Sequence, residues 1–217
     1  MADVVLFGTG QIAEVVYDYL RYDSEHKVVA CALDADYIET DTFHDVPIVP
    51  FDQVEKNFHP DTHLFFTAIG FGQHNQAREQ KYQAAKSKGY KFLTYISSQA
   101  HVWPTADIGE NTFIMEGNVI QPHAKIGNNV IVWSGNHIGH HTTIKDHCFV
   151  ASHAVISGGV TIGEHCFVGV NATIRDNISI GGGSVVGAGA LVLKDAPANS
   201  LFKGVASEAT PLLKQVI

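Results

Sequence analysis

Residues 102–192 carry an aliphatic side chain at every sixth position without interruption. The series is Val102, Ile108, Ile114, Ile120, Ile126, Val132, Ile138, Ile144, Val150, Ile156, Ile162, Val168, Ile174, Ile180, Val186 and Val192. Neither the 3.6-residue period of a helix nor the two-residue period of a strand produces this spacing. A coil made of three short strands and three corners does, because each face needs one large inward side chain. A six-residue repeat is typical of a parallel β-helix, so we predict that architecture for residues 98–193.

Two other positions of each six-residue unit predict where the chain turns. The third residue after the aliphatic one is mostly Gly, Asn or His, the types that best tolerate positive φ. These predicted corner residues are Asn111, Gly117, His123, Asn129, Gly135, His141, His147, His153, Gly159, His165 and Asn171. The fourth residue is almost always small, which suits a second inward position. Three units make a coil of eighteen residues, so we predict about five coils.

The residue before each aliphatic one points outward and gives the three faces different characters. One face is apolar, with Phe113, Ile131, Phe149, Phe167 and Val185. The second is polar, with Asp107, Lys125, Thr143, Thr161 and Ser179, and the third is mixed, with Val119, His137, Val155, Thr173 and Leu191. A tall apolar stripe marks an interface, which favours a closed homotrimer joined through that face. The alternative is that the N-terminal domain or the tail covers the stripe.

Residues 1–97 follow a different pattern, in which buried strands alternate with helical stretches. Strands are expected near 4–7, 27–33, 46–49, 63–69 and 91–96, and helices up to about residue 22 and over 76–88. Such alternation predicts a small Rossmann-like α/β domain with a parallel sheet. A tail containing Pro197 and Pro211 occupies residues 194–217.

Composition narrows the class of protein. The formal charge of −8 and the lack of any Lys/Arg block argue against a nucleic-acid surface. No stretch approaches the roughly 20 apolar residues needed to span a bilayer, and the N-terminus leads directly into a strand, so we expect no secretory signal. The three cysteines form no CxxC pair, which fits a reducing cytoplasm. Cys148 and Cys166 lie eighteen residues apart and are expected to be small inward core residues rather than a disulfide or metal site.

His140 differs from the other histidines of the repeat. Five of them occupy the predicted corner position, whereas His140 alone lies in the outward position before it. Gly158 and Gly159 follow eighteen residues later, and they would leave an open notch with accessible backbone N–H groups. An imidazole can take a proton from a nucleophile, and an N–H group can stabilise an oxyanion, so the notch suits acyl transfer. A solvated corner histidine is the alternative.

Other polar residues of the repeat allow more than one interpretation. His141 could orient His140 by a hydrogen bond or merely fill its corner. Asn118 and Asn136 are expected to form a stacked amide ladder that satisfies buried polar groups, rather than to contact substrate. His147 stacks on His165, and His123 on His141, but on different corners and with no third ligand evident. We therefore expect no metal.

The segment Gly8-Thr9-Gly10-Gln11-Ile12-Ala13 is a G-x-G-x-x-A motif that follows a strand and opens a helix. Its glycines would let a phosphate approach the helix N-terminus, and Asp34 follows at a spacing suited to a ribose hydroxyl. These features alone suggest a dinucleotide. The domain is short and nothing else supplies a hydride-transfer site, so a nucleotide-diphosphate sugar, which uses the same cradle, is the favoured ligand.

The hexads, the segment Trp133-Ser134-Gly135-Asn136-His137-Ile138-Gly139-His140-His141 and the segment Gly169-Val170-Asn171-Ala172-Thr173-Ile174 resemble the left-handed β-helix acyltransferases. The nearest subgroup comprises bacterial nucleotide-sugar acetyltransferases with a small N-terminal α/β domain, including those acting on 4-amino sugars of surface glycans. The resemblance extends to about Lys194. It implies a trimer with active sites between subunits, acetyl-CoA as co-substrate and no permanently bound cofactor.

The resemblance also implies roles for single residues. It places the catalytic base at His140 and the backbone oxyanion and CoA contacts at Gly158, Val170 and Ala188 along one ridge. The nucleotide-sugar contacts fall on Gly8, Thr9, Gly10, Asp34, Asp36, Ile69 and Gly70. Two departures are that His141 stands where relatives often have an acidic residue, and that Gly204-Val205-Ala206-Ser207 replaces the usual Gly-x-Pro-Ala, so no CoA contact is assigned to the tail.

These observations favour a cytoplasmic acetyl-CoA-dependent N-acetyltransferase that acts on a nucleotide-activated amino-deoxy sugar, a precursor of surface glycan such as O-antigen. In the expected mechanism the amine attacks directly with His140 as general base. O-acetylation of a sialic-acid-like sugar is an alternative, and a non-catalytic nucleotide-binding scaffold is another. The expected partners are the two substrates and further copies of the chain, without nucleic acid or a membrane span.

Overall fold

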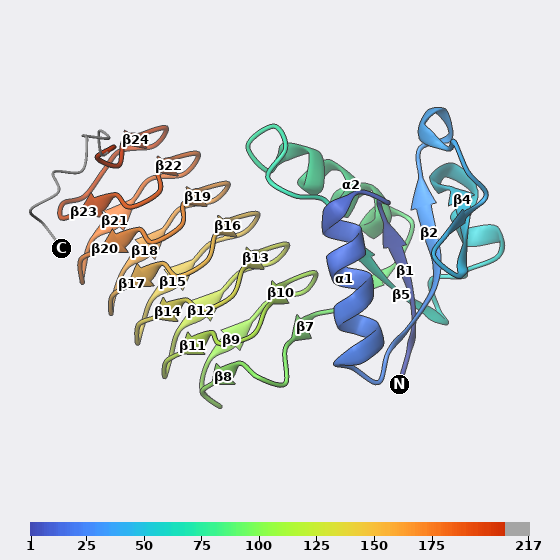
Figure 1. Ribbon diagram of the computed structural model, residues 1–217, viewed down its shortest axis with the longest axis horizontal. Coiled ribbons are helices and arrows are strands. Elements are labelled where there is room, and N and C mark those ends of the chain that lie inside the picture. Colours follow the sequence, from blue (N-terminus) through green and yellow to red (C-terminus); the bar gives the residue numbers. More distant parts are fainter. Residues whose placement is uncertain (207–217) are drawn as a thin grey trace, which may run out of the picture.

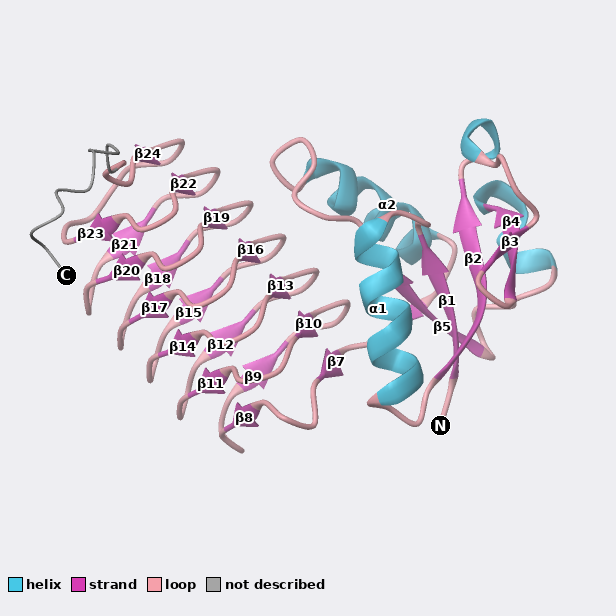
Figure 2. Cartoon of the chain, viewed as in Figure 1, coloured by secondary structure: helices cyan, strands magenta, loops and turns pink. Residues whose placement is uncertain are grey.

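Short apolar strands in the N-terminal part form one sheet in a computed structural model that describes residues 1–206. The strands are β1 (Asp3–Phe7), β2 (Lys27–Leu33), β3 (Thr42–Phe43), β4 (Val46–Pro50), β5 (His63–Thr67) and β6 (Lys91–Phe92), in the order β3-β4-β2-β1-β5-β6. Two α-helices, α1 (Gln11–Tyr22) and α2 (Gln76–Ser87), and two 3₁₀ helices, η1 (Ala35–Tyr37) and η2 (Phe51–Lys56), complete the unit (Figure 2). The predicted α/β domain is confirmed. Only β3 runs antiparallel, because a tight hairpin with His44 at φ +50° joins it to β4.

The rest of the described chain winds into a three-sided β-helix whose coils stack in chain order (Figure 1). The apolar-face sheet contains β7 (Tyr95–Ile96), β10 (Phe113–Ile114), β13 (Ile131–Val132), β16 (Phe149–Val150), β19 (Phe167–Val168), β22 (Val185–Val186) and β24 (Leu201–Phe202). The mixed-face sheet contains β8 (His101–Val102), β11 (Val119–Ile120), β14 (His137–Ile138), β17 (Val155–Ile156), β20 (Thr173–Ile174) and β23 (Leu191–Val192). The polar-face sheet contains β9 (Asp107–Ile108), β12 (Lys125–Ile126), β15 (Thr143–Ile144), β18 (Thr161–Ile162) and β21 (Ser179–Ile180).

Every aliphatic residue of the six-residue series is the second residue of one of these strands, as predicted. The predicted corner residues all have positive φ, for example Asn111 at +52° and His141 at +58°. Side chains eighteen residues apart pair directly, as Phe113 does with Ile131. We name the corners after the faces they join: apolar–mixed, mixed–polar and polar–apolar.

The β-helix is longer than expected, with about six to seven coils instead of five. Tyr95–Ile96 adds a strand before the regular series, and Leu201–Phe202 adds one after it by pairing with β22. The second addition escapes the six-residue pattern because a loop containing Pro197 separates it from Val192. The β-helix therefore extends into the segment expected as a tail. Residues 207–217 of that tail, including Ser207, lie outside the described residues.

The small inward positions hold polar groups that are hydrogen-bonded inside the coil. The side chain of Asn118 donates to the carbonyl of Trp133 and accepts from the N–H of Asn136, whose own Oδ1 accepts from the N–H of Ala154. The expected amide ladder is thus present. Cys148 and Cys166 are fully buried free thiols in the same interior, also as expected.

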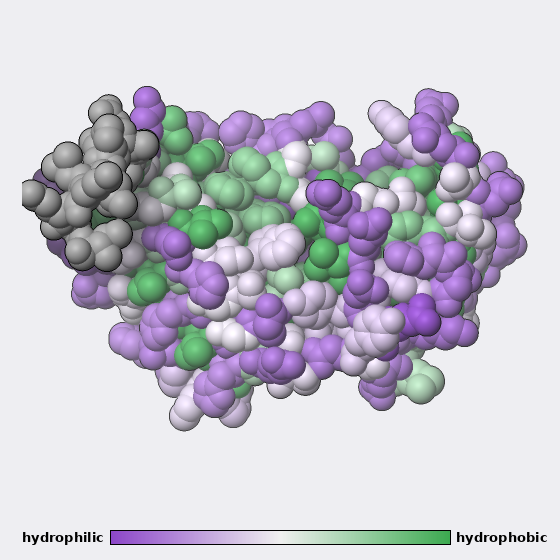
Figure 3. All heavy atoms as spheres, in the orientation of Figure 1, coloured by the Kyte–Doolittle hydropathy of each residue, from purple (hydrophilic) through white to green (hydrophobic). Residues whose placement is uncertain are grey.

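The apolar face is covered by the chain's own N-terminal domain, so its assignment as the subunit interface was wrong. Phe113 and Ile131 are 2% exposed and Phe149 is 8% exposed, in one core cluster with residues of α1 and β1. Phe71, from the loop before α2, packs on Phe167 with ring centroids 4.4 Å apart. In Figure 3, apolar side chains gather where the β-helix adjoins α1. Periodicity showed that this stripe must be buried, but gave no information on what buries it.

Three strands of the mixed-face sheet carry exposed apolar side chains. Val119, Val155 and Leu191 are 39%, 41% and 62% exposed. Among residues 1–206, no helix combines the length and apolar character that a bilayer crossing needs.

Asp23, at the end of α1, ties the two domains together at the first coil. Its carboxylate accepts hydrogen bonds from the hydroxyl of Tyr95 at 2.5 Å, the hydroxyl of Ser97 at 2.9 Å and the N–H of Ser98 at 3.0 Å. Hydrogen bonds from Ser98 and Tyr95 lower the pKa of Asp23 to about 2. Because these bonds need the ionised carboxylate, they favour the folded state only while Asp23 is charged.

We expect Asp23→Asn to destabilise the protein at neutral pH, as measured by denaturant unfolding. The pKa of Asp23 is lower in the folded than in the unfolded chain, so its stabilisation is fully present above about pH 4 and is lost as the pH falls toward 2. The difference between wild type and variant should shrink over that range. Asp18→Asn, at an exposed position of the same helix, should show no such difference. An equal effect of both variants would contradict this role of Asp23.

Candidate functional site

His140 lies on the mixed–polar corner between β14 and β15, and Gly158 lies one coil further on. The N–H of Gly159 donates to the carbonyl of His140 at 2.8 Å, which fixes the stacking. A Cβ placed on Gly158 would lie 2.7 Å from Cε1 and Nε2 of the imidazole. The ring of His140 therefore uses the space that the missing side chain of Gly158 leaves. The predicted vertical pairing is present, and His140 is exposed to solvent.

The backbone N–H of Gly158 donates to no group among the described residues. It lies in the outward corner position, next to the imidazole of His140. A free donor beside a solvent-exposed base is the pair of groups that acyl transfer uses.

His141 contacts His140 through the Nδ1 atoms of the two rings, which are 3.2 Å apart. His141 is itself fixed, because its N–H donates to the carbonyl of Pro122 and its ring packs 4.9 Å from that of His123. The N–H of His140 donates to the Oε1 of Gln121 at 2.9 Å. The structure therefore brings the predicted pair together and adds Gln121, which sequence reasoning missed because it lies one coil earlier.

Val170 and Ala188 do not share a ridge with Gly158, contrary to the expectation. They are stacked on each other at the apolar–mixed corner, where the N–H of Gly189 donates to the carbonyl of Val170. The period explains the difference, since the twelve residues from Gly158 to Val170 span two thirds of a coil and pass the polar–apolar corner to reach the apolar–mixed corner. The N–H groups of Val170 and Ala188 also have no acceptor among residues 1–206.

The predicted nucleotide-binding turn lines a pocket of about 600 Å³ at the N-terminus of α1. Five predicted residues lie around it: Gly8, Thr9, Gly10, Ile69 and Gly70. Gly8 has φ +117°, and a Cβ there would lie 2.9 Å from the carbonyl oxygen of Ala68, so the tight turn requires glycine. The first N–H groups of α1 have no partner within the helix and point toward this turn, which suits a phosphate.

The two predicted aspartates are not part of this pocket lining. Asp34 pairs instead with Lys81 at 2.6 Å, and Asp36 is exposed within η1. Tyr37 and Glu39 line the pocket in their place. Tyr37 and Glu39 follow the second strand, as Asp34 does, but their spacing in the sequence gave no reason to choose them instead of the two aspartates.

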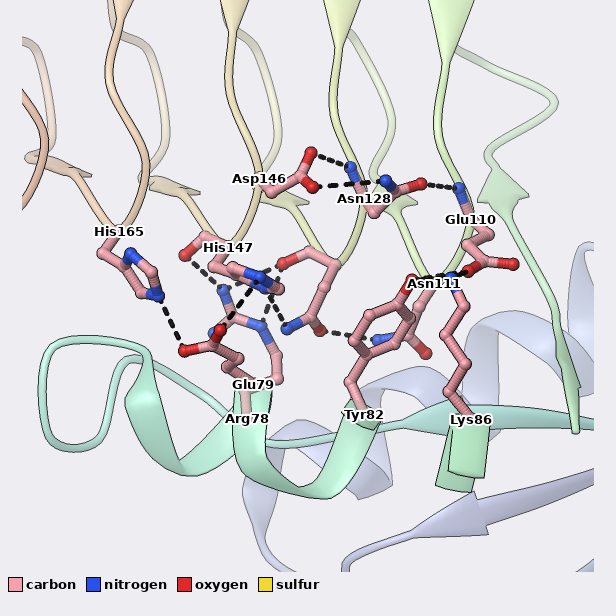
Figure 4. A network of polar contacts seen from close by, with 11 residues as sticks. Arg78, Glu79, Tyr82, Lys86, Glu110, Asn111, Asn128, Asp146, His147 and His165 are labelled. Atoms are coloured by element: carbon pink, nitrogen blue, oxygen red, sulfur yellow. Dashed lines mark hydrogen bonds and ion pairs between the residues drawn. The ribbon is translucent and has the colours of Figure 1, made fainter. Parts of the chain in front are cut away.

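Arg78 and Glu79 of α2, which the sequence gave no reason to single out, lie against the polar–apolar corner (Figure 4). Glu79 is 2.8 Å from Nε2 of His165 and 3.4 Å from Nε2 of His147. These three side chains lie close enough together to be considered as metal ligands. The sequence showed two stacked histidines without a third ligand, and the third group is a carboxylate from the N-terminal domain.

A chain of side-chain hydrogen bonds fixes the proton on His147. The buried N–H of Thr67 donates to Oδ1 of Asn111, Nδ2 of Asn111 donates to Oδ1 of Asn129, and Nδ2 of Asn129 faces Nδ1 of His147 at 2.9 Å. Neutral His147 therefore carries its proton on Nε2, toward Glu79. Burial lowers the pKa of His147, which supports the neutral form. A metal ion would need the Nε2 lone pair, so the ladder favours a hydrogen-bonded carboxylate bridge at this place.

Comparisons with known proteins show which proteins share this sequence pattern and this fold. The model of the GMPPB C-terminal domain matches residues 92–191. Perosamine N-acetyltransferase from Caulobacter crescentus, solved with CoA and GDP-perosamine, superposes with a TM-score of 0.83 at 29% identity over 94% of this chain and 98% of that one. Variants of that protein with one histidine replaced by Asn or Ala have also been solved. A comparison with curated proteins gives no match.

Two further solved structures share the fold. The acetyltransferase domain of PglB from Neisseria gonorrhoeae FA1090, in complex with acetyl coenzyme A, has a TM-score of 0.78 at 23% identity, covering 94% of this chain and 98% of that one. WeeI from Acinetobacter baumannii AYE has a TM-score of 0.75 at 21% identity, covering 93% and 96%. This chain therefore has the fold of these acetyltransferases, a small α/β domain followed by a hexapeptide-repeat β-helix, and it is similar over 94% of its length to perosamine N-acetyltransferase.

We expect Gly158→Ala to displace the imidazole of His140, because the new methyl group would lie 2.7 Å from its ring atoms. The ring resonances of His140 in a heteronuclear NMR spectrum should shift while the melting temperature changes little. Gly72→Ala is the control, since a Cβ there meets nothing within 4 Å. Unchanged His140 resonances in Gly158→Ala would show that the two groups are not in contact.

Proposed function

We propose that this protein is an acetyl-CoA-dependent N-acetyltransferase that modifies the amino group of a nucleotide-activated amino-deoxy sugar. The observation that carries the proposal is the exposed imidazole of His140 beside the free N–H of Gly158. The pocket at Gly8, Gly10 and Gly70 supports a nucleotide-linked acceptor. The 29% identical relative solved with CoA and GDP-perosamine supports the same pair of substrates.

The reaction would proceed by direct attack. The sugar nitrogen bonds to the thioester carbonyl carbon as Nε2 of His140 takes a proton from the nitrogen, and the N–H of Gly158 stabilises the oxyanion. When the carbon–sulfur bond breaks, the CoA sulfur leaves and receives that proton. An acyl-enzyme route would need a nucleophile at the notch, and Cys148 and Cys166 are fully buried in the coil.

His141 would set the proton position on His140. In the tautomer that can act as a base, Nδ1–H of His140 donates to Nδ1 of His141 across 3.2 Å and leaves the Nε2 lone pair free. A neutral acceptor stabilises an imidazolium less than a carboxylate does.

The two halves of the proposed site lie on different parts of one chain. The pocket belongs to the domain that covers the apolar face, whereas His140 lies on the mixed–polar corner, beyond the mixed-face sheet. We therefore propose a cyclic trimer in which the pocket and the apolar–mixed corner of one chain, with Val170 and Ala188, face His140 and Gly158 of the next. The exposed valines of the mixed-face sheet fit a buried position in that assembly.

The identity of the acceptor is tested by following CoA thiol release with a panel of nucleotide amino sugars, beginning with a GDP-linked 4-amino sugar. Mild base distinguishes the proposed amide product from the ester that O-acetylation would give. Binding of nucleotide without thiol release would favour a non-catalytic scaffold. We place the reaction in the cytoplasm, as a step that supplies precursors of surface glycan such as O-antigen.

Replacement of His140 by Ala or Asn should leave a folded protein whose turnover is lower by about 10²–10⁴-fold, the range expected for loss of a general base. Thiol release at saturating substrate measures the effect. His59→Gln, in an exposed loop of the N-terminal domain, is the control for loss of a histidine. Turnover near the wild-type level in His140→Ala would refute the assignment.

A shared site also predicts complementation between two inactive chains. Gly10→Glu should block phosphate binding without disturbing the fold, because a Cβ at Gly10 meets nothing within 4 Å. Mixing it with His140→Ala by co-expression should restore about one quarter of the wild-type activity, since one interface in four would pair two intact halves. Activity no higher than that of the separate variants would show that each chain uses its own His140.

A further inference from the structure

We propose that Arg78 is a positioning residue for the nucleotide-sugar pocket, because its guanidinium holds the pocket segment Ile69–Gly70 against the β-helix. The inference rests on the proposed function, since it assigns the pocket to the nucleoside diphosphate of the acceptor. Nothing in the sequence pattern points to Arg78, which lies in α2 outside the G-x-G-x-x-A motif.

The guanidinium of Arg78 joins three parts of the molecule, and Figure 4 shows its side toward the β-helix. Its Nη1 donates to the carbonyl of Gly70 at 2.9 Å and to that of Ile69 at 3.3 Å. The same atom donates to Oδ1 of Asn75, the residue before α2, at 2.8 Å. Its Nε and Nη2 donate to backbone carbonyls of the polar–apolar corner, at Asn129, His147 and Cys148.

Arg78 is only 1% exposed and has no carboxylate among these partners. Burial lowers its pKa to about 9, so it is still protonated at neutral pH. A buried cation is costly, and an apolar side chain of the same size often gives equal or greater stability. What the guanidinium adds is a fixed planar arrangement of donors. Some of its donors bond the loop and the others bond the β-helix, so the side chain sets the distance between the loop and the β-helix.

The pocket segment is held at both ends. The N–H of Thr67, at the end of β5, donates to Oδ1 of Asn111 in the β-helix, and the carbonyls of Ile69 and Gly70 accept from Arg78. On its other side, a Cβ at Gly70 would lie 3.3 Å from Ile12 in the first turn of α1. Displacement of Ile69–Gly70 therefore changes the space between this segment and the helix N-terminus, where the phosphates are expected.

Glu79 provides a matched control on the same helix. Its carboxylate pairs with His147 and His165 on the same corner of the β-helix and, among residues 1–206, forms no hydrogen bond or ion pair with a residue that lines the pocket. Glu79→Gln keeps the shape of the side chain and weakens the junction between the domains without touching Ile69–Gly70.

The experiment measures steady-state thiol release by Arg78→Lys, Arg78→Met and Glu79→Gln in the full-length protein. A lysine keeps the charge but cannot reach both sets of carbonyls. We expect KM for the nucleotide sugar to rise about tenfold in Arg78→Lys and further in Arg78→Met, in line with lost charge-assisted hydrogen bonds. KM for acetyl-CoA should be unchanged, and Glu79→Gln should keep the wild-type KM for both substrates.

Two direct measurements accompany the kinetics. Calorimetric titration with GDP, UDP and dTDP reports binding in the pocket without turnover, and hydrogen exchange of the peptide covering residues 69–75 reports the order of the segment. Both the nucleotide affinity and the hydrogen-exchange rate should change in Arg78→Lys. If Arg78→Met does not fold, Arg78→Lys alone tests the inference. An unchanged KM for the nucleotide sugar in a folded Arg78→Lys protein would overturn the inference, as would equal increases in Arg78→Lys and Glu79→Gln.

Failure of the proposed function gives a different result. A wild-type protein that binds a nucleoside diphosphate but transfers no acetyl group would refute the proposed function, and the inference would then be decided by the binding of the variants. A wild-type protein that binds none of the three nucleotides, and turns over no nucleotide sugar, would overturn both.

Discussion

The in-register stacking of each residue on the one eighteen positions later is the constraint on which the structure depends. Each coil donates backbone hydrogen bonds to the next, as Phe113 N–H does to the carbonyl of Val130. Side chains of one position therefore form columns, and each column has a single chemical character. The N-terminal domain contacts the column formed by Asn111, Asn129, His147 and His165. The column of the proposed site contains His140 and Gly158. A one-residue insertion in any coil would rotate every following column out of place.

The β-helix could be predicted in detail because its causes are local. Aliphatic residues at six-residue spacing become the inward residue of every strand, and Asn, Gly and His occupy the positive-φ corners for steric reasons. The pairing of His140 with Gly158 follows from the same spacing. The coil number was underestimated because the last strand, Leu201–Phe202, is separated from Val192 by an irregular loop. The placement of Val170 on a different corner from Gly158 also follows from the six-residue period, because twelve residues are not a whole coil.

Contacts between distant segments could not be predicted, since no periodicity records them. The sequence indicated that the apolar stripe is buried, but only the structure shows that α1 and Phe71 cover it. Asp34 has the expected spacing after its strand, yet Lys81, forty-seven residues away, engages its carboxylate. Arg78 is a charged residue in a polar helix, and nothing in the sequence shows that its side chain is fully buried. In each case the missing information is the identity of the partner rather than the nature of the residue.

The three corners of the β-helix differ in what lies against them. On the polar–apolar corner α2 lies against the β-helix, and Arg78 donates to the carbonyls of Asn129, His147 and Cys148. The other two corners have free N–H groups, at Gly158 on one and at Val170 and Ala188 on the other. Among residues 1–206, the N–H groups of Asp146, Glu164 and Gly182 on the polar–apolar corner also lack an acceptor. The corners therefore differ in what lies against them rather than in having free donors. Arg78 links the pocket lining to this corner with one side chain, because it donates both to the carbonyls of Ile69 and Gly70 and to carbonyls of the β-helix.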